Sequence, residues 1–377
     1  MLPIITLFIY HSNFLFLYFS PELKRVIMSK GKKRIGILTA GGDCPGINAA
    51  IRGVGKTAIV KYGMEVLGFS SGFLGLINKD YIELTEPQLS GILTLGGTIL
   101  GTSRVKPFKK DEFTFNSIDK PKLIKKHYEE LGLDCVVCIG GNGTQKNAMK
   151  LSNYGLNVIG IPKTIDNDVW GTDVTFGFDS ALGIATDAID RLHSTANSHS
   201  RIMVIEIMGH HAGWLTLYSG MAGGGDVILI PELDYDLDTI MSYLEERAQK
   251  KKSYSIVVVA EGIKLKSKSK SAAQYIAHQI KKRTGLETRE TILGYIQRGG
   301  SPTPADRILA TRYGAYAAEL INNEQYGLMV KKEGDTISSI PLTEVGSKLR
   351  TVPPDHPIIK KARGLGICLG NPVNRNN

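Results

Sequence analysis

Three short loops of this chain carry the residue types that phosphoryl transfer requires. Ala40–Gly46 (AGGDCPG) and Gly140–Thr144 (GGNGT) are rich in glycine, which lets backbone N–H groups approach an anion closely. Pro162–Asp168 (PKTIDND) holds an ammonium, a hydroxyl and two carboxylates. Such a set could supply a cation for the moving group, a base for the attacking hydroxyl and an acid for Mg²⁺. Each loop alone resembles an ordinary turn, but the three together favour a functional site.

Later polar segments fall at the expected edges of strands or helices. They are SHSR (198–201), MGHHAG (208–213), AEG (260–262), TR (288–289) and GYIQRGG (294–300). Arg201, Arg289 and Arg298 could converge on a phosphorylated substrate, because a guanidinium binds phosphate in a bidentate manner. Taken singly, each arginine is more typical of a surface ion pair.

Two other patterns predict no chemistry. Ala50–Thr57 (AIRGVGKT) approaches a phosphate-binding P-loop, but it falls late in a predicted helix instead of directly after a strand. Its N–H groups are therefore used within the helix. Cys135 and Cys138 form a C-x-x-C on a predicted strand, where they point to opposite faces. This placement argues against a metal or redox site.

Apolar runs rich in β-branched residues alternate with helical periods from residue 33 onward. The expected strands cover residues 34–39, 65–70, 135–139, 157–161, 202–207, 227–230, 255–260 and 288–293. The expected helices cover residues 45–62, 121–131, 146–151, 211–221, 237–250, 272–284 and 304–323. This alternation predicts an α/β fold with mostly parallel sheets. Ligands bind at the carboxyl ends of strands in such sheets, and the three loops follow strands.

Composition narrows the class of protein. The 377 residues exceed one average core, so two or three domains are expected. Only four cysteines occur, so no disulfide framework is expected, and a reducing, cytoplasmic location fits. The formal net charge is +10, but the lysine-rich runs at 30–34, 250–252 and 264–270 have no interleaved aromatic residues. Nucleic acid is therefore not an expected partner.

Residues 1–27 differ from the rest of the chain. The stretch from Leu2 to Phe19 is apolar and aromatic, yet it lacks the basic start and the cleavage site of a signal peptide. It is marginal for a membrane span, which takes about 20 apolar residues. We expect an extension outside the fold, with Met28 as the working start and no membrane partner. A membrane anchor is the alternative.

From about Lys33 to about Asn323 the chain resembles the phosphofructokinase family. The resemblance rests on TAGGDCPGINAAIRG, GGTILGTSR, IGGNGT, PKTIDND, FGFDSA, MGHHAGW, AEG and ETRETILGYIQRGGSPTPADRILA, in this order. It implies two Rossmann-like three-layer α/β/α domains with mostly parallel sheets and the active site in the cleft between them. The expected units are a donor domain over 28–170, completed by about 300–350, an acceptor domain over 171–299 and a tail over 351–377.

The resemblance also implies transfer of the γ-phosphoryl group of ATP to the C1 hydroxyl of fructose 6-phosphate, with Mg²⁺ as cofactor. It makes Asp166 the base. Donor contacts are implied for Gly42, Arg104, Val105, Gly141, Asn142, Gly143 and Thr144. Sugar-phosphate contacts are implied for Thr164, Ile165, Met208, Gly209, His210, Glu261, Tyr295, Ile296, Gln297 and Arg298. Arg201 and Arg289 match two arginines that family members supply from a neighbouring subunit, so the resemblance implies a homodimer or homotetramer with shared sites.

Several positions depart from the family pattern. Asn142 replaces a metal-associated acid, so Asp168 is an alternative metal ligand. His210 replaces an arginine, which weakens one phosphate contact or makes it pH-dependent. Gly143 is typical of ATP users and Lys163 of pyrophosphate users, a mixture that resembles the mixed-substrate bacterial group. We favour ATP, because position 143 lacks the acidic side chain that would obstruct a nucleotide; pyrophosphate is the alternative.

Three other functions stay open at this point. A kinase of the NAD-kinase or lipid-kinase type shares a GGDGT-like loop, although PKTIDND and YIQRGG argue against it. A non-catalytic nucleotide-sensing protein on the same scaffold is consistent with the unusual Asn142 and His210. A P-loop NTPase is the weakest alternative, because of the position of its motif.

Overall fold

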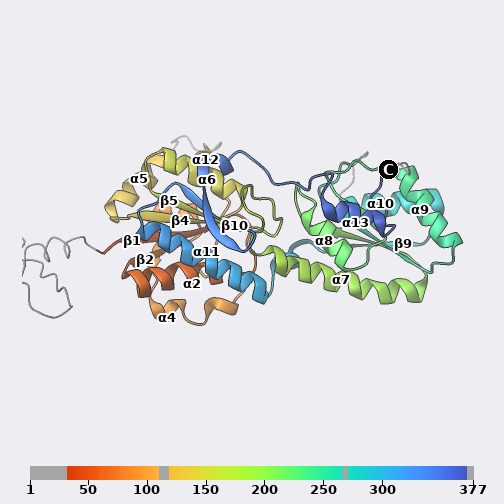
Figure 1. The fold of residues 1–377 in the computed structure, drawn as a ribbon, viewed down its shortest axis with the longest axis horizontal. Coiled ribbons are helices and arrows are strands. Elements are labelled where there is room, and N and C mark those ends of the chain that lie inside the picture. The colour runs from red at the N-terminus through yellow and green to blue at the C-terminus, as the bar shows by residue number, and fades with distance from the viewer. Residues whose placement is uncertain (1–31, 110–118, 266–270, 372–377) are drawn as a thin grey trace, which may run out of the picture.

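The computed structural model describes residues 32–109, 119–265 and 271–371. These residues form two β-sheets, and helices cover both faces of each (Figure 1). The expected extension over 1–27 lies outside the described residues, as does most of the lysine-rich run at 264–270. None of the helices in the described part combines the length and the apolar composition that a membrane span requires. The two-unit α/β architecture expected from the sequence is confirmed.

The first sheet has seven strands in the order β11-β10-β5-β4-β1-β2-β3. Their bounds are β1 Arg34–Ala40, β2 Glu65–Phe69, β3 Tyr81–Glu83, β4 Cys135–Gly140, β5 Val158–Pro162, β10 Leu328–Glu333 and β11 Thr336–Pro341. The inner strands pair in parallel, while β3 and β11 are antiparallel edges. Cys135 and Cys138 belong to core clusters on opposite faces of the sheet, as predicted.

Helices pack on both faces of this sheet. They are α2 Ile47–Lys56, continued by the π-helix η1 Thr57–Lys61, α3 Phe73–Asn78, α4 Glu86–Leu89, the 3₁₀ helix η2 Ile92–Thr94, α5 Lys120–Glu130, α6 Asn142–Asn153, α11 Pro304–Asn322 and α12 Leu342–Val345. A Cβ at Gly53 in α2 would lie 2.7 Å from the carbonyl oxygen of Thr311 in α11. Gly53 therefore serves close helix packing, and the P-loop-like segment is helical as predicted.

The second sheet has four parallel strands in the order β7-β8-β6-β9. Their bounds are β6 Ile202–Ile207, β7 Val227–Leu229, β8 Ser255–Ala260 and β9 Thr288–Ile292. The surrounding helices are α7 Phe178–His199, α8 Trp214–Ala222, α9 Leu237–Gln249, α10 Ala272–Thr284, the 3₁₀ helix η3 Gly294–Arg298 and α13 Pro357–Gly364. α7 and α8 share one core cluster with the sheet, and α9 and α10 share the other.

Several elements differ from the sequence-based expectation. The 22-residue helix α7 and the β10–β11 hairpin fall where no element was expected. The short elements α3, α4, β3, α12 and α13 were likewise not expected. The helix expected at 146 begins instead at Asn142, inside the second glycine loop. The helix expected over 45–62 begins at Ile47 and changes to a π-helix at Thr57.

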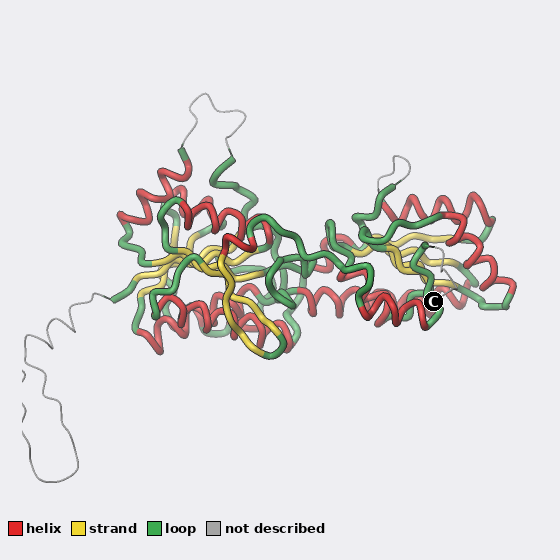
Figure 2. The backbone as a smooth tube through the Cα atoms, turned by 45° about the horizontal axis from the view of Figure 1, so that its top comes forward, coloured by secondary structure: helices red, strands yellow, loops and turns green. Residues whose placement is uncertain are grey.

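The C-terminal residues join the second unit. After α12 the chain crosses from the first sheet to α13 (Figure 1). Cys368 pairs with Val227 at the start of β7, and its carbonyl accepts a hydrogen bond of 2.9 Å from Ile228 N. The described part of the expected tail is thus packed against β7, while the exact limits of the domains stay a prediction. Figure 2 shows the two groups of strands on either side of a region that contains many loops.

Candidate active site

A cavity of about 320 Å³ lies at the carboxyl ends of β1, β4 and β5. The three loops singled out in the sequence all line it, together with the segment 103–106. His210 and Arg298 reach the same cavity from the second unit. Parallel strands explain this meeting, because their carboxyl ends share one edge of the sheet. The cavity therefore combines two glycine-rich turns, three carboxylates and several cations.

The first loop is shaped by glycine. Gly41 has φ 85°, a left-handed conformation, and its N–H donates to Ser103 O at 3.0 Å. A Cβ at Gly42 would lie 1.6 Å from Arg298 Nη1. A side chain at position 42 would occupy this space. Glycine there therefore allows the positively charged Arg298 of the second unit to approach the loop. The ammonium of Lys163 donates to Gly42 O from the other side.

The second loop starts helix α6. Gly141 is its N-cap residue, and the first turn contains no acidic side chain. The N-terminus of a helix carries partial positive charge, so this end favours a bound anion. Asn142 donates through Nδ2 to Asp168 O at 3.2 Å, which ties the second loop to the third. A Cβ at Gly143 would meet no atom within 4 Å, so this position opens into space.

The third loop presents both of its carboxylates to the cavity. Asn167, between them, has φ 51°, an uncommon value for a residue with a side chain. Its Oδ1 accepts a hydrogen bond of 3.0 Å from Thr175 N. Asp166 N donates to Thr164 Oγ1 at 3.1 Å. These bonds fix the turn that separates Asp166 from Asp168.

Burial controls the charges in this loop. It raises the pKa of Asp166, while the nearby Arg298 guanidinium opposes that rise. The pKa of Asp168 is raised to about 7, first by burial and then by repulsion from Asp166. Burial lowers the pKa of Lys163. Charged groups with such shifted pKa values, gathered in one cleft, are typical of catalytic sites.

Three buried polar atoms in this site have no hydrogen-bond partner among the described residues. They are Asn142 Oδ1, Asp166 Oδ1 and Arg298 Nε. Buried polar atoms are nearly always partnered in folded proteins, because an unpartnered one costs about 1–3 kcal/mol. An amide oxygen, a carboxylate oxygen and a guanidinium N–H left open together indicate a ligand with both donor and acceptor atoms.

On the acceptor side, a second group of predicted residues adjoins the cavity. Glu261 Oε1 accepts hydrogen bonds from Gly209 N at 3.3 Å and His210 N at 2.9 Å. The buried Gln297 accepts from Met208 N at 3.4 Å. Glu261 and Gln297 thus hold the loop that carries His210.

Other predicted residues lie away from the cavity. Arg201 and Arg289 both pair with Glu287, each at 2.9 Å, near the amino ends of β6 and β9. β6 separates Arg201 from Met208 by seven residues, or roughly 20 Å. Within one chain, Arg201 and Arg289 therefore do not meet Arg298, because only Arg298 follows its strand, and their convergence across subunits stays a prediction. Tyr295 and Ile296 are 72% and 61% exposed and do not line the cavity.

The cavity also contains residues that sequence reasoning passed over. These are Asp43, Phe73, Ser103, Lys106 and Asn147. Asp43 stands in the first quoted loop and could have been chosen from its place after β1. Phe73 begins α3 just beyond β2, and its apolar side chain gave no reason to choose it as a site residue from the sequence. Within the described ranges no three His, Cys, Asp or Glu side chains gather as a metal-ligand group.

Proteins of known family are similar in sequence to this chain. The family model described as Phosphofructokinase matches residues 34–321. The chain is 64% identical over 337 residues to ATP-dependent 6-phosphofructokinase 3 of Bacteroides thetaiotaomicron, covering 89% of this chain and 100% of the relative. It is 55% identical over 360 residues to ATP-dependent 6-phosphofructokinase of Spirochaeta thermophila, covering 90% and 98%.

Solved structures share the fold. Phosphofructokinase from Saccharomyces cerevisiae matches with a TM-score of 0.74 at 31% identity, covering 83% of this chain and 45% of that one. A pyrophosphate-dependent phosphofructokinase from Nitrosospira multiformis matches with a TM-score of 0.78 over 92% and 95% of the two chains. Its identity is 21%, so this second match shows the fold alone. On the family model and these high identities, the chain belongs to the phosphofructokinase family.

Proposed function

We propose that this chain is an ATP-dependent 6-phosphofructokinase. It transfers the γ-phosphoryl group of ATP to the C1 hydroxyl of fructose 6-phosphate, giving fructose 1,6-bisphosphate and ADP. The observation that carries the proposal is the unpartnered Asp166 Oδ1 in one cavity with both glycine-rich loops. The curated relatives named above, which the chain covers almost completely, are called ATP-dependent 6-phosphofructokinases.

Asp166 is the base in this proposal. A sugar hydroxyl is a weak nucleophile, so a carboxylate that accepts its proton speeds the attack on phosphorus. Burial raises the pKa of Asp166 and so makes the carboxylate more basic. The Arg298 guanidinium acts against that rise and favours the ionised form that a base requires. Thr164 and Ile165, directly before the base, belong to the sugar side of the site.

The donor polyphosphate occupies the two glycine-rich loops. The first turn of α6 and the side chains of Arg104 and Lys106, which also line the cavity, offset its negative charge. Val105 lines the same part of the cavity, and Thr144 binds Ala40 O at 3.3 Å, which joins the two loops. Gly42 and Gly141 keep these turns free of side chains.

The residues present fit Mg²⁺ bound together with the nucleotide. The unpartnered Asn142 Oδ1 and the carboxylate of Asp168 are hard oxygen donors on neighbouring loops. Mg²⁺ commonly takes only one or two protein ligands and completes its shell with water and substrate phosphates. When bound, the ion neutralises charge on the phosphates. Asn142 and Asp168 would hold it, with Asp168 supplying the only charge of the two.

ATP is the proposed donor because Gly143 opens into space. A nucleotide extends beyond its transferred phosphoryl group, and the missing side chain leaves room for that extension. Pyrophosphate is the second candidate, since the ammonium of Lys163 lines the cavity and would offset a compact anion. The same ammonium already donates to Gly42 O, so it is engaged by the protein itself.

The acceptor site is proposed to be shared between subunits of a homo-oligomer, a dimer or a tetramer. Within one chain, His210 and Arg298 reach the cavity, while Arg201 and Arg289 remain at the other end of the second sheet. A neighbouring copy would supply these two arginines to the sugar phosphate. Met208, Gly209, Glu261 and Gln297 would shape the sugar site from within the chain, with Tyr295 and Ile296 at its exposed margin.

A cytoplasmic location is part of this proposal. All four cysteines are buried free thiols, which suits a reducing compartment. Fractionation of native cells with an antibody against the chain tests it.

The direct test is an assay of the purified chain with fructose 6-phosphate and Mg²⁺, offered ATP or pyrophosphate separately. We expect turnover with ATP and little or none with pyrophosphate. Turnover with pyrophosphate alone would reverse the donor assignment. Nucleotide binding without turnover of either donor would contradict the proposed function and identify a sensing protein.

A further inference from the structure

The segment that follows α12 connects the two halves of the site. It crosses from the first sheet toward α13 (Figure 1), and it contains Arg350, which lies between α12 and α13 in the sequence. We propose that Arg350 is a positioning residue, which holds the Asp166–Asp168 loop in register with the Met208–Gly213 loop of the acceptor side. This inference deepens the proposed function and rests on it.

Arg350 binds the carboxylate loop through its backbone and its side chain. Its N–H donates to Asp168 O at 2.9 Å, and its Nη1 donates to Asn167 O at 2.9 Å. One residue earlier, Leu349 forms an antiparallel bridge with Val169. The crossing segment therefore contacts three consecutive residues at the end of the loop that contains both carboxylates.

The bond to Asn167 secures an uncommon backbone conformation. Asn167 is 5% exposed and has φ 51°, which costs free energy for a residue with a side chain. This left-handed turn allows Asp166 and Asp168 both to line the cavity. Without the Arg350 guanidinium, the buried Asn167 carbonyl would lose this partner, and the turn could relax toward a less strained φ. Such a change would rotate the Asp166 carboxylate.

The same residue binds the acceptor side. Trp214 begins α8 directly after the Met208–Gly213 loop, and its Nε1 donates to Arg350 O at 3.0 Å. The guanidinium carbon of Arg350 lies 4.1 Å from the centroid of the Trp214 ring, which is a cation–π contact with a buried indole. Arg350 thus contacts the carboxylate loop and the start of α8 at once.

A neighbouring contact strengthens this connection. Glu232 Oε1 accepts hydrogen bonds from Val352 N at 2.8 Å and from Gly213 N at 2.9 Å. The crossing segment is therefore bonded to the end of the acceptor loop as well as to Trp214. Arg350 is not among the residues that line the cavity in the described structure, so it acts through the residues it holds.

The proposal predicts a specific kinetic signature. Small errors in the placement of a base slow the chemical step strongly, whereas donor and sugar contacts elsewhere are preserved. Arg350→Met keeps an unbranched apolar stem against Trp214 but removes the donor and the charge. We expect kcat to fall about tenfold or more, with KM for ATP and fructose 6-phosphate within about threefold of the native values. Arg350→Lys keeps a cation but not the planar fork, so its kcat should lie between, at least about threefold below native.

A matched control separates positioning from general stabilisation. Arg247 also contacts an aromatic ring, Tyr243, and donates to a backbone carbonyl, Tyr254 O at 3.4 Å, but it lies far from the cavity. Arg247→Met should lower the melting temperature and leave kcat unchanged. Native kcat in Arg350→Met, or raised KM with native kcat, would overturn the proposal. Where Arg350→Met fails to fold, native kcat in Arg350→Lys overturns it instead.

The native chain, assayed beside the variants, distinguishes two failures. Absence of native turnover with fructose 6-phosphate and either donor contradicts the proposed function itself. Native turnover combined with unchanged kcat in the folded Arg350 variants contradicts only the role of Arg350.

Discussion

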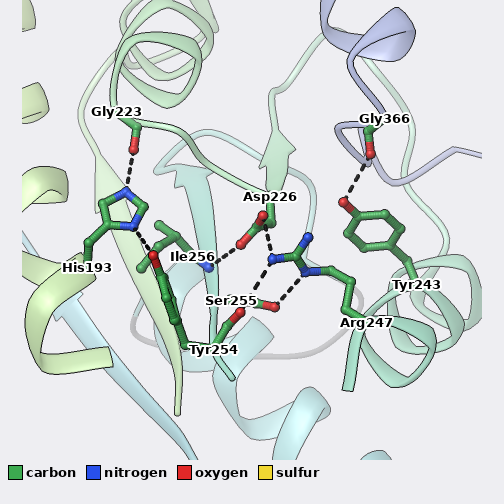
Figure 3. Close-up of polar contacts among 9 residues, drawn as sticks. All are labelled: His193, Gly223, Asp226, Tyr243, Arg247, Tyr254, Ser255, Ile256 and Gly366. Carbon is green, nitrogen blue, oxygen red and sulfur yellow. Dashed lines mark hydrogen bonds and ion pairs between the residues drawn. The ribbon is translucent and has the colours of Figure 1, made fainter. Parts of the chain in front are cut away.

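Two clusters of partly buried polar groups in this molecule differ in how completely they are hydrogen-bonded. One lies at the amino ends of β7 and β8 in the second unit (Figure 3). There Asp226 pairs with Arg247 at 2.7 Å and accepts from Ile256 N at 2.9 Å. Both ring nitrogens of His193 are engaged as well, by Gly223 O at 2.6 Å and Tyr254 Oη at 3.1 Å.

The other cluster is the cavity at the carboxyl ends of the first sheet. Asn142, Asp166 and Arg298 each leave a buried polar atom without a partner among the described residues. The two clusters are similar in residue types, with a carboxylate, an arginine and other polar groups in each. A network whose polar atoms are all hydrogen-bonded stabilises the fold, whereas one with unpartnered atoms can bind a ligand through them. We call the first kind closed and the second kind open. Between these two clusters, hydrogen-bond completeness is therefore a clearer difference than residue type.

The largest effect should follow removal of the open carboxylate. In Asp166→Ser, kcat should fall about a thousandfold, because proton acceptance is lost, while binding of fructose 6-phosphate is largely kept. Steady-state kinetics and calorimetric titration of the sugar phosphate measure the two quantities. Unchanged turnover would show that Asp166 is not the base. The open cluster would then have no catalytic role in this account.

A somewhat smaller loss is expected when an acid enters the open space beside α6. Gly143→Asp places a carboxylate where the nucleotide phosphates are proposed to bind, and like charges at contact cost several kcal/mol. We expect kcat/KM for ATP to fall about a hundredfold or more. Native ATP turnover in this variant would defeat the account of donor choice, and pyrophosphate turnover, measured in parallel, shows whether the site changes donor.

The closed network should respond in the opposite way. Arg247→Met leaves the half-buried Asp226 carboxylate without its ion pair, which should lower the free energy of unfolding by about 2 kcal/mol. The distance from the cavity predicts native kcat. Urea unfolding tests the first statement and initial rates test the second. A lower kcat under conditions where the variant is fully folded would show that the two clusters are coupled.

The mildest effect is a partial recovery of activity. Arg201→Ala and Asp166→Ser should each be inactive alone, because each removes one part of a shared site. In a mixed two-fold dimer, one of the two sites carries both native residues, so random mixing should restore about a quarter of native activity. The rates are compared before and after co-refolding. Absence of any recovery would show that Arg201 of one copy does not complete the site of another.

Most strands and all three loops were predictable because long buried β-branched runs leave a strong signal. Helix α7 was missed because its buried stripe is weak: Ala181, Ala185 and Ala196 supply much of it. The β10–β11 hairpin was missed because much of both strands is only partly buried, and β10 includes charged residues such as Lys331 and Lys332.

Chain direction explains which of the predicted site residues one chain brings to the cavity and which it does not. Asp166 and Arg298 follow their strands, so they arrive at the edge that binds ligands. Arg201 precedes β6 and Arg289 lies near the start of β9, which places both at the opposite edge. No local pattern marked Arg350, because its role arises from contacts with residues more than 130 positions away in the sequence.

The central claim is that Asp166 faces the reacting hydroxyl. A crystal structure of the chain with fructose 6-phosphate and a non-hydrolysable ATP analogue measures this directly. A carboxylate oxygen of Asp166 should lie about 2.6–3.2 Å from the C1 hydroxyl, with the terminal phosphate held by the Gly140–Thr144 loop. A sugar bound elsewhere, or an Asp166 carboxylate turned away from that hydroxyl in the ternary complex, would contradict the account.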